Sequence, residues 1–341
     1  MGMLDHWQPV ARVSDLGRKP LPVVIAGNQV AVFRTESGAL GAVADACPHR
    51  RLKLSAGEVV GERLQCRYHG WTFDTCGEGE SPGSPKMSTC TTSYDIREEY
   101  GLIFLKTRTS NPQFPTLDNK GYFHIGTLVH DAPAPLELTM DNFNEIEHSG
   151  TVHKNFGYDL DRMHDVKVSF ESTDDSIRVM NVGPTKRLPL LDRLFIGVKP
   201  GDLFHDDWTT WFSPLHSQFD HWWTNASDTE ERKIRWRIFL FYVPVTDTST
   251  RVFSMLYAKS RWPFGGGLRL GRRYIRRQTE SEIMADVDML QYLADYEPGI
   301  AGLKLSRFDK SLGLTRERIQ RVYRGESDGK GPNRFSLRIA S

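Results

Sequence analysis

The sequence predicts an α+β chain of two domains, with an all-β domain first and a larger domain of sheet and helices after it. Three observations support this class. At 341 residues, the chain is too long for one ordinary hydrophobic core. Short β-like runs separated by turn residues fill residues 21–105. Residues 268–296 lose the turn signals and become helical, so helices are expected late in the chain.

The composition is that of an ordinary globular protein. Hydrophobic residues make up 39%, aromatic residues 11% and charged residues 26%. Because 44 Lys and Arg nearly balance 43 Asp and Glu, no overall field favours nucleic acid or an anionic membrane. No apolar run is long enough to span a bilayer and the start lacks a leader, so a cytoplasmic location is expected.

The first domain is predicted over residues 1–115 as a small antiparallel β domain. Its strands are expected in runs that begin at Pro22, Val30, Leu40, Gly70 and Gly101. Residues 116–135 contain several prolines and no clear period, and are predicted to be a linker.

The second domain is predicted over residues 136–327, and residues 328–341 are expected to form a loose tail. In the run 234–242, Ile234, Trp236 and Ile238 alternate with polar residues and predict a strand. Helices are expected at residues 136–156, 268–296 and 315–323.

The strongest motif joins two cysteines and two histidines. Cys47-Pro-His49 and Cys66-Arg-Tyr-His69 each offer one thiolate and one imidazole. Such a set suits a [2Fe-2S] centre with both cysteines on one iron and both histidines on the other. Neutral imidazoles raise the reduction potential above that of an all-Cys cluster. Cys76 lies outside the motif, as does Cys90, and both are expected to be ordinary thiols.

A structural zinc site is the alternative for the same four residues, since two cysteines and two histidines also suit tetrahedral zinc. A zinc finger would pair cysteine with cysteine and histidine with histidine. Here each presumed loop carries one of each, which favours the iron–sulfur interpretation.

A second metal site is predicted where His148 and His153 lie near several carboxylates, those of Asp141, Glu145 and Glu147. Two histidines and one carboxylate form the facial triad of non-haem Fe(II) oxygenases. Residues five apart on a regular helix differ by roughly 140°, so convergence requires the kink or helix end that Gly150 permits.

Acids that could complete such a triad include Glu282, Asp286 and Asp288 of the predicted late helix, although most such residues are solvated charges. His216 and His221 repeat the five-residue spacing and form a rival pair. These two and His205 are expected to be ordinary polar groups of loops or strands. The aromatic residues around them are candidates for a substrate pocket: Phe212, Phe219, Trp222 and Trp223.

Two stretches resemble one known family. Cys47–Arg50, Gly57-Glu58 and Cys66–Asp74 resemble the Rieske domain of ring-hydroxylating and demethylating oxygenases. The pattern Asn142-x2-Glu145-x2-His148-x4-His153 resembles their mononuclear iron motif. The resemblance extends from about His6 to Tyr323. It implies a Rieske [2Fe-2S] domain followed by a catalytic domain in which helices flank a curved antiparallel sheet.

The resemblance also implies roles for residues. The cluster would be held by Cys47, His49, Cys66 and His69, and the mononuclear Fe(II) by His148, His153 and Asp286. In the family an Asp lies four residues before a Leu that is followed by Glu or Gln. Asp286, Leu290 and Gln291 match this pattern. Asn142 and Glu145 would serve catalysis. Glu145, where the family commonly has Asp, would bridge to the Rieske histidine of a neighbouring subunit in a homotrimer.

The implied activity is hydroxylation or oxidative demethylation of a small organic substrate with O2. Electrons from NAD(P)H would arrive through a ferredoxin or a flavin and iron–sulfur reductase. Basic residues near the cluster are compatible with docking such a donor: Arg50, Arg51, Lys53 and Arg67. Dioxygenase and desaturase activities share the same iron site. The alternatives outside the family are an electron carrier fused to a ligand-binding domain, and a zinc-stabilised binding protein.

Overall fold

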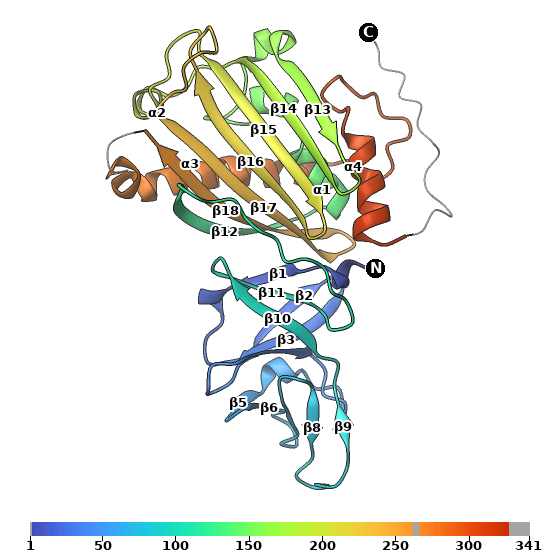
Figure 1. Ribbon diagram of the computed structural model, residues 1–341. Helices are drawn as coiled ribbons and strands as arrows, with labels where there is room; N and C mark the ends of the chain where they lie inside the picture. The colour runs from blue at the N-terminus through green and yellow to red at the C-terminus, as the bar shows by residue number, and fades with distance from the viewer. Residues whose placement is uncertain (1, 262–265, 327–341) are drawn as a thin grey trace. The chain divides into compact units, whose positions relative to one another are not determined.

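The computed structural model of the chain describes residues 2–261 and 266–326 (Figure 1). The predicted tail, residues 328–341, lies outside the described residues. The chain divides into two compact units: the first is Met1–Pro115 with Val243–Asp247, and the second contains the rest. The first is built from strands and the second from a large sheet with helices, so the predicted α+β class is confirmed. Among the described residues, no helix is long and apolar enough to cross a membrane.

The first unit contains three small antiparallel sheets, with strand orders β1-β11-β10, β2-β3-β4 and β5-β6-β7-β8-β9. Short 3-10 helices occupy Met3–Asp5, Val13–Asp15 and Leu54–Ala56. The strands are β1 (Gln8–Arg12), β2 (Leu21–Ile25), β3 (Asn28–Arg34), β4 (Leu40–Ala44), β5 (Glu58–Val60), β6 (Arg63–Gln65), β7 (Thr72–Phe73), β8 (Glu78–Glu80), β9 (Thr89–Cys90), β10 (Tyr94–Glu99) and β11 (Leu102–Thr107).

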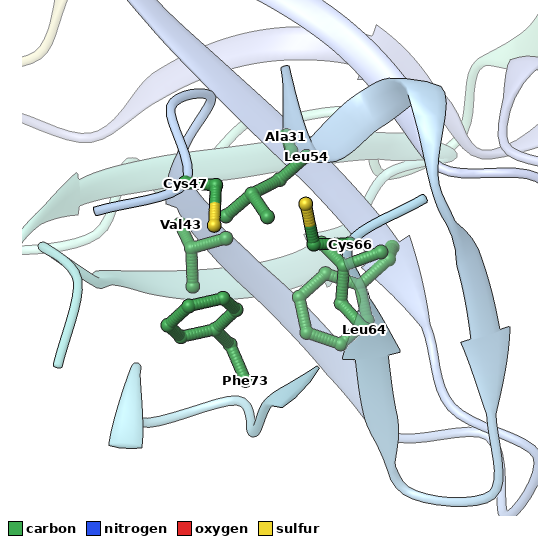
Figure 2. Close-up of a cluster of buried hydrophobic side chains, with 8 residues drawn as sticks. Ala31, Val43, Cys47, Leu54, Leu64, Cys66 and Phe73 are labelled. Carbon is green, nitrogen blue, oxygen red and sulfur yellow. The ribbon is translucent and has the colours of Figure 1, made fainter. Parts of the chain in front are cut away.

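Buried side chains of β3, β4, β6 and β7 form the core that supports the cysteine loops (Figure 2). Phe33, Leu64 and Phe73 are fully buried there, together with the side chains of Cys47 and Cys66. The two cysteines therefore belong to the apolar core and not to the surface of the unit.

The second unit is organised by one seven-stranded sheet, in the order β12-β18-β17-β16-β15-β14-β13. Its strands are β12 (Phe123–Ala132), β13 (Lys167–Ser172), β14 (Ser176–Pro184), β15 (Leu203–Phe212), β16 (Leu215–Thr224), β17 (Ile234–Thr246) and β18 (Ser249–Ser260). The segment 116–135, expected to be a linker, contains the edge strand β12, which pairs with β18. A register shift between His124 and Gly126 interrupts the alternation by which a strand is recognised in a sequence.

The first helix of this unit is much shorter than residues 136–156. α1 (Leu136–Phe143) ends at Asn144, and a 3-10 helix follows at Glu147–Gly150. The Glu145 carboxylate accepts hydrogen bonds from the backbone N–H groups of Glu147 and His148. This local pairing gives those N–H groups an alternative to the helical bonds, and the helix stops.

A 3-10 helix at Leu160–Asp165 precedes β13, and the remaining helices follow later in the chain. They are α2 (Leu190–Ile196), α3 (Gly266–Met289), the 3-10 helix Leu290–Tyr292, α4 (Leu312–Arg318) and the π-helix Ile319–Tyr323. Both α1 and α3 lie beside the β12–β18 edge of the sheet (Figure 1). α1 also contacts α3, which brings the segment after α1 close to the last turns of α3.

Candidate metal centres and substrate cavity

Two loops of the first unit have the same backbone turn after their cysteine. The N–H of Arg51 donates to the carbonyl of Cys47 at 2.8 Å, and the N–H of Gly70 donates to that of Cys66 at 3.0 Å. Both closing residues have positive φ angles, 59° at Arg51 and 70° at Gly70. A left-handed residue four positions after the cysteine therefore folds each loop back, and each loop presents one cysteine and one histidine.

The four candidate ligands of these loops are divided between core and surface. Cys47 and Cys66 are 2% and 3% exposed, whereas His49 and His69 lie at the surface with ring centroids 4.6 Å apart. Burial raises the pKa of the Cys47 thiol, and the nearby Cys66 raises it further. A buried thiol resists ionisation, but a coordinating metal deprotonates it, so this pair suits a bound iron.

The spacing of the four candidate ligands favours a [2Fe-2S] cluster over a single zinc ion. Four ligands of one tetrahedral zinc have donor atoms about 3.3–3.8 Å apart. Within the described ranges, the group of three or more metal-binding side chains with donor atoms inside 4.8 Å lies in the second unit. The four candidates of the first unit do not converge on one ion, whereas a [2Fe-2S] cluster needs a cysteine pair and a histidine pair apart.

The second unit brings together three of the predicted ligands. His148 Nε2 lies 2.9 Å from His153 Nε2, and Asp286 Oδ1 lies 3.1 and 3.3 Å from these nitrogens. For ligand atoms about 2.1 Å from a metal and at right angles, the separation is about 3.0 Å. The three atoms therefore form a triangle of the size that one face of an octahedral metal site requires.

The surroundings of this triangle also fit a cation. Asp286 Oδ1 is buried, and the groups that it faces are the two histidine nitrogens. Burial alone would lower the pKa of His148, but its hydrogen bonds to Asp286 and Glu145 raise that pKa to about 10. A positive charge is therefore favoured between these groups, and a metal ion supplies it without a proton.

Each histidine of the triangle has its own carboxylate behind it. Glu145 Oε1 contacts Nδ1 of His148, and Glu282 Oε2 lies 3.2 Å from Nδ1 of His153. Glu282 is buried and also accepts from the backbone N–H groups of Lys154 and Asn155. Carboxylates in this position hold a ligating imidazole in the tautomer whose Nε2 faces the metal.

Lys186 fastens the chain between the two histidines. Its Nζ donates to the carbonyls of Ser149, at 2.7 Å, Gly150, at 3.4 Å, and His153. One ammonium thus satisfies three carbonyl groups, two in the 3-10 helix Glu147–Gly150 and one in the irregular segment after it. Lys186 follows β14 in the sequence, so the sheet holds the ligand loop in place.

The other predicted residues of this region have different positions. Asn142 Nδ2 donates to the backbone carbonyl of Asp286 at 3.2 Å, which ties α1 to α3. Asp141 pairs with Arg316, and Glu147 is exposed. Asp288, the rival third ligand, is exposed on α3. The structure therefore gathers Glu145, Glu282 and Asp286 at the histidines and leaves the other acids outside.

A cavity of about 600 Å³, including the part that opens to solvent, adjoins the triangle. His221 and Phe219 line this cavity, whereas Phe212, Trp222 and Trp223 do not. The residues that line it are Phe143, Glu145, His148, Ser149, His153, Phe156, Gly157, Asp206, Phe219, His221, Ile238, Leu240, Thr279, Glu282, Ile283 and Asp286.

The histidines outside the motif differ in their positions. His205 pairs with Asp228, and His216 Nδ1 donates to the carbonyl of Pro214, so both side chains have structural partners. His221 instead lines the cavity and hydrogen-bonds Asp206 at 3.1 Å. Sequence reasoning missed Asp206, and the only available signal was the wealth of aromatic residues around His221.

Known proteins match both units. Residues 6–95 match the Rieske [2Fe-2S] domain, and residues 132–321 match the vanillate O-demethylase oxygenase C-terminal domain. Protein TIC 55, chloroplastic, of Arabidopsis thaliana is 27% identical over 190 residues, which cover 51% of this chain and 35% of that protein. Methylxanthine N1-demethylase NdmA of Pseudomonas putida is 31% identical over 163 residues, covering 43% of this chain and 46% of that protein.

The fold is also that of solved oxygenases. The crystal structure of dicamba monooxygenase bound to 3,6-dichlorosalicylic acid superposes with a TM-score of 0.75 at 20% identity. It covers 96% of this chain and 99% of the other. The chain spans about a third of the length of the first curated relative and less than half of the second.

A Rieske domain followed by this C-terminal domain defines the class, and the chain belongs to the family of Rieske oxygenases with the vanillate O-demethylase oxygenase C-terminal domain. The predicted family is therefore confirmed. The cofactors of this class are a Rieske [2Fe-2S] cluster and a mononuclear iron, and both units have residues that fit them.

Proposed function

We propose that this protein is a terminal oxygenase that hydroxylates or oxidatively demethylates a small organic substrate with O2. The observation that carries the proposal is the triangle of His148 Nε2, His153 Nε2 and Asp286 Oδ1 beside the cavity, with sides of 2.9–3.3 Å. A three-ligand face leaves the other positions of an octahedral iron open. Bound there, Fe(II) supplies the site at which dioxygen is activated.

The side chains of this protein would bind the metal, orient its ligands and bind the substrate. His148, His153 and Asp286 would hold the metal, and Glu145 and Glu282 would keep the two imidazoles in the correct tautomer. The apolar walls of the cavity would bind the substrate next to the metal and exclude water. An electron carrier that only binds a ligand needs neither this metal face nor its supporting carboxylates.

The test combines metal analysis with turnover. The purified chain should contain about three irons per molecule with two acid-labile sulfides, because one cluster and one mononuclear iron add up to that number. The reduced protein should give a Rieske EPR signal and, with nitric oxide, a high-spin Fe(II) nitrosyl signal. A Rieske signal without the nitrosyl signal in metal-replete protein would make this an electron carrier.

The electron donor is proposed to dock at the histidine side of the cluster. His49 and His69 are exposed, and four basic residues of the same loops are exposed without an ion pair in the described part of the chain: Arg50, Arg51, Lys53 and Arg67. An acidic ferredoxin, or the acidic surface of a reductase fed by NAD(P)H, complements such a surface.

Charge reversal tests this docking site. Replacing Arg50 and Arg67 together by Glu should slow reduction of the cluster at low ionic strength and weaken its salt dependence. The matched control is Arg18→Glu, an exposed arginine of the same unit outside the cluster loops. Equal slowing in both variants would argue against a specific docking site.

We also propose a homotrimer in which Glu145 carries electrons between subunits. One oxygen of Glu145 contacts His148, a proposed iron ligand. The other accepts from backbone N–H groups, and a carboxylate has further lone pairs that a cluster histidine of a neighbouring chain could use. The arrangement would make each active centre depend on two copies.

Complementation between two inactive variants tests this arrangement. Cys47→Ser removes the cluster and Asp286→Ala removes the iron, so neither variant alone should turn over. Hybrid trimers made by co-expression should recover activity, because the intact cluster of one copy would serve the intact iron of the next. Hybrid trimers of verified mass that stay inactive would contradict electron transfer between subunits.

A further inference from the structure

The cavity beside the metal triangle is apolar over most of its wall. The side chains that make this wall are Phe143, Phe156, Phe219, Ile238, Leu240 and Ile283. Phe156 packs against the ring of His221 with centroids 5.0 Å apart, and also against Trp223 and Trp236 outside the cavity. Aromatic and branched side chains at this density suit a ring-shaped or similarly flat apolar body.

The charged groups of the cavity are all acidic. Glu145, Asp206, Glu282 and Asp286 line it, whereas no Lys or Arg does. The nearby ammonium of Lys186 is committed to three backbone carbonyls. A carboxylate substrate would lose its hydration shell and find acids in place of a guanidinium or ammonium partner. Even with the two positive charges of a bound Fe(II), the four carboxylates leave the cavity without surplus positive charge, so it disfavours anions.

One polar pair in the cavity is incompletely satisfied. Asp206 on β15 and His221 on β16 face each other in the strand register, and Asp206 Oδ1 lies 3.1 Å from His221 Nε2. In the neutral ring this bond places the proton on Nε2, so Nδ1 keeps a lone pair.

His221 is 9% exposed, and its Nδ1 is buried without a hydrogen-bond partner among the residues described. The hydroxyl of Ser149, another residue of the cavity wall, is also buried and has no hydrogen-bond partner among the described residues. Buried polar atoms are normally paired, so each of these two atoms calls for a partner other than the described residues. A ligand with a hydrogen-bond donor would satisfy the acceptor nitrogen of His221.

We propose that the cavity selects a neutral substrate with an apolar ring body and one hydroxyl or N–H group, which donates to His221 while Asp206 holds that imidazole in place. This inference rests on the proposed function, since it names the substrate class of the same site. His221 is the specificity-determining residue in this scheme, because it contacts the substrate and not the metal, and Asp206 is a positioning residue that acts through His221.

Binding of matched probes to the iron-loaded protein without a reductant tests the proposal. One set is 4-methoxyphenol, 1,4-dimethoxybenzene and 4-methoxybenzoate; the other is 6-methoxy-2-naphthol, 2,6-dimethoxynaphthalene and 6-methoxy-2-naphthoate. Each set keeps the ring and changes only the polar group from donor to blocked ether to anion. Dissociation constants are measured by calorimetry, which needs no turnover.

The phenol or naphthol should bind about tenfold more tightly than its ether, as one neutral hydrogen bond to a buried acceptor provides, and more tightly than its carboxylate. His221→Phe should abolish the preference for the hydroxyl while the ether still binds. The control His205→Asn, outside the cavity, should leave the preference intact. Tighter binding of the carboxylates, equal binding within both sets, or no binding of either hydroxyl probe at millimolar concentration would overturn the proposal.

The iron count and nitrosyl EPR signal of the same sample separate the two hypotheses. If both metals are present and the hydroxyl preference is missing, only the substrate class is wrong. If the nitrosyl signal is missing, the proposed oxygenase function fails whatever the probes do.

Discussion

Replacing Glu282 by Gln should weaken binding of the mononuclear iron while the cluster stays intact. The carboxylate of Glu282 accepts from the backbone N–H groups of Lys154 and Asn155 at 3.0–3.3 Å, and its Oε2 lies 3.2 Å from Nδ1 of His153. Glutamine has the same size but only one acceptor oxygen. The amide N–H2 group replaces one oxygen, so either a backbone N–H group loses its acceptor or Nδ1 of His153 faces a donor, which costs about 1–3 kcal/mol.

That cost applies to the loop that positions His153, a proposed metal ligand. We therefore expect iron affinity to fall about 10- to 100-fold, or about 1.4–2.7 kcal/mol, the usual effect of removing such an outer partner. The assay is an anaerobic Fe(II) titration of protein stripped of mononuclear iron by a chelator, followed by the amplitude of the nitrosyl EPR signal. The Rieske signal of the same sample reports whether the first unit is undamaged.

Asp288→Asn is the matched control, because Asp288 is an exposed acid of the same helix. It should bind Fe(II) as the parent does. The reasoning would be refuted if Glu282→Gln bound Fe(II) within twofold of the parent, or if Asp288→Asn lost as much affinity.

Three further perturbations follow from the same geometry. Asp286→Ala should abolish the nitrosyl signal and leave the Rieske signal at full amplitude, and a retained nitrosyl signal would exclude Asp286 as a ligand. Lys186→Met should leave three loop carbonyls without their donor and lower the Fe(II) affinity about tenfold or more. Lys186→Arg should recover part of that affinity. Equal Fe(II) affinity in the two variants would argue that the ammonium of Lys186 does not hold the ligand loop. Burial lowers the pKa of His216 to about 4, from 6.5 in an exposed histidine. Below about pH 6.5 the histidine binds a proton in the unfolded chain but not in the folded chain. The free energy of unfolding should therefore fall as the pH falls, by about 2 kcal/mol between pH 7 and pH 5. Urea unfolding should show a smaller loss over that range in His216→Asn, and an unchanged pH dependence would assign the effect to other groups.

The cluster loops could be found from the sequence because their chemistry is local. Each loop carries its cysteine and histidine within four residues and closes on one left-handed residue, so no long-range contact is needed to define it. Strand β12 was missed for the opposite reason: its pairing with β18 joins residues more than 100 positions apart, and a bulge near His124 hides the alternation. The early end of α1 was missed because it depends on the Glu145 side chain bonding to the backbone just after it.

The choice among the three acids of α3 follows from helical geometry. Glu282 and Asp286 are four residues apart and share one face, whereas Asp288 lies roughly 200° around the helix from Asp286. The structure has Glu282 and Asp286 buried at the histidines and Asp288 exposed. Once the segment is predicted to be a helix, Asp288 can be rejected because it lies on another face. The same prediction does not show which of the other two acids lies nearer the proposed metal site. That depends on how far along its axis α3 packs against α1, which is a tertiary property.

The rival histidine pair, His216 and His221, can be rejected by the same kind of argument once the segment is known to be a strand. Side chains alternate between the two faces of a strand, and the register of β16 runs without interruption from one histidine to the other, so residues five apart point to opposite sides. His216 accordingly stacks on Trp211 and Phe241, away from the cavity that His221 lines. Two histidines on opposite faces of one strand cannot bind one metal. The strand instead leaves His221 with Asp206 across the register, a pairing that suits recognition of a substrate and that the spacing of histidines alone could not reveal.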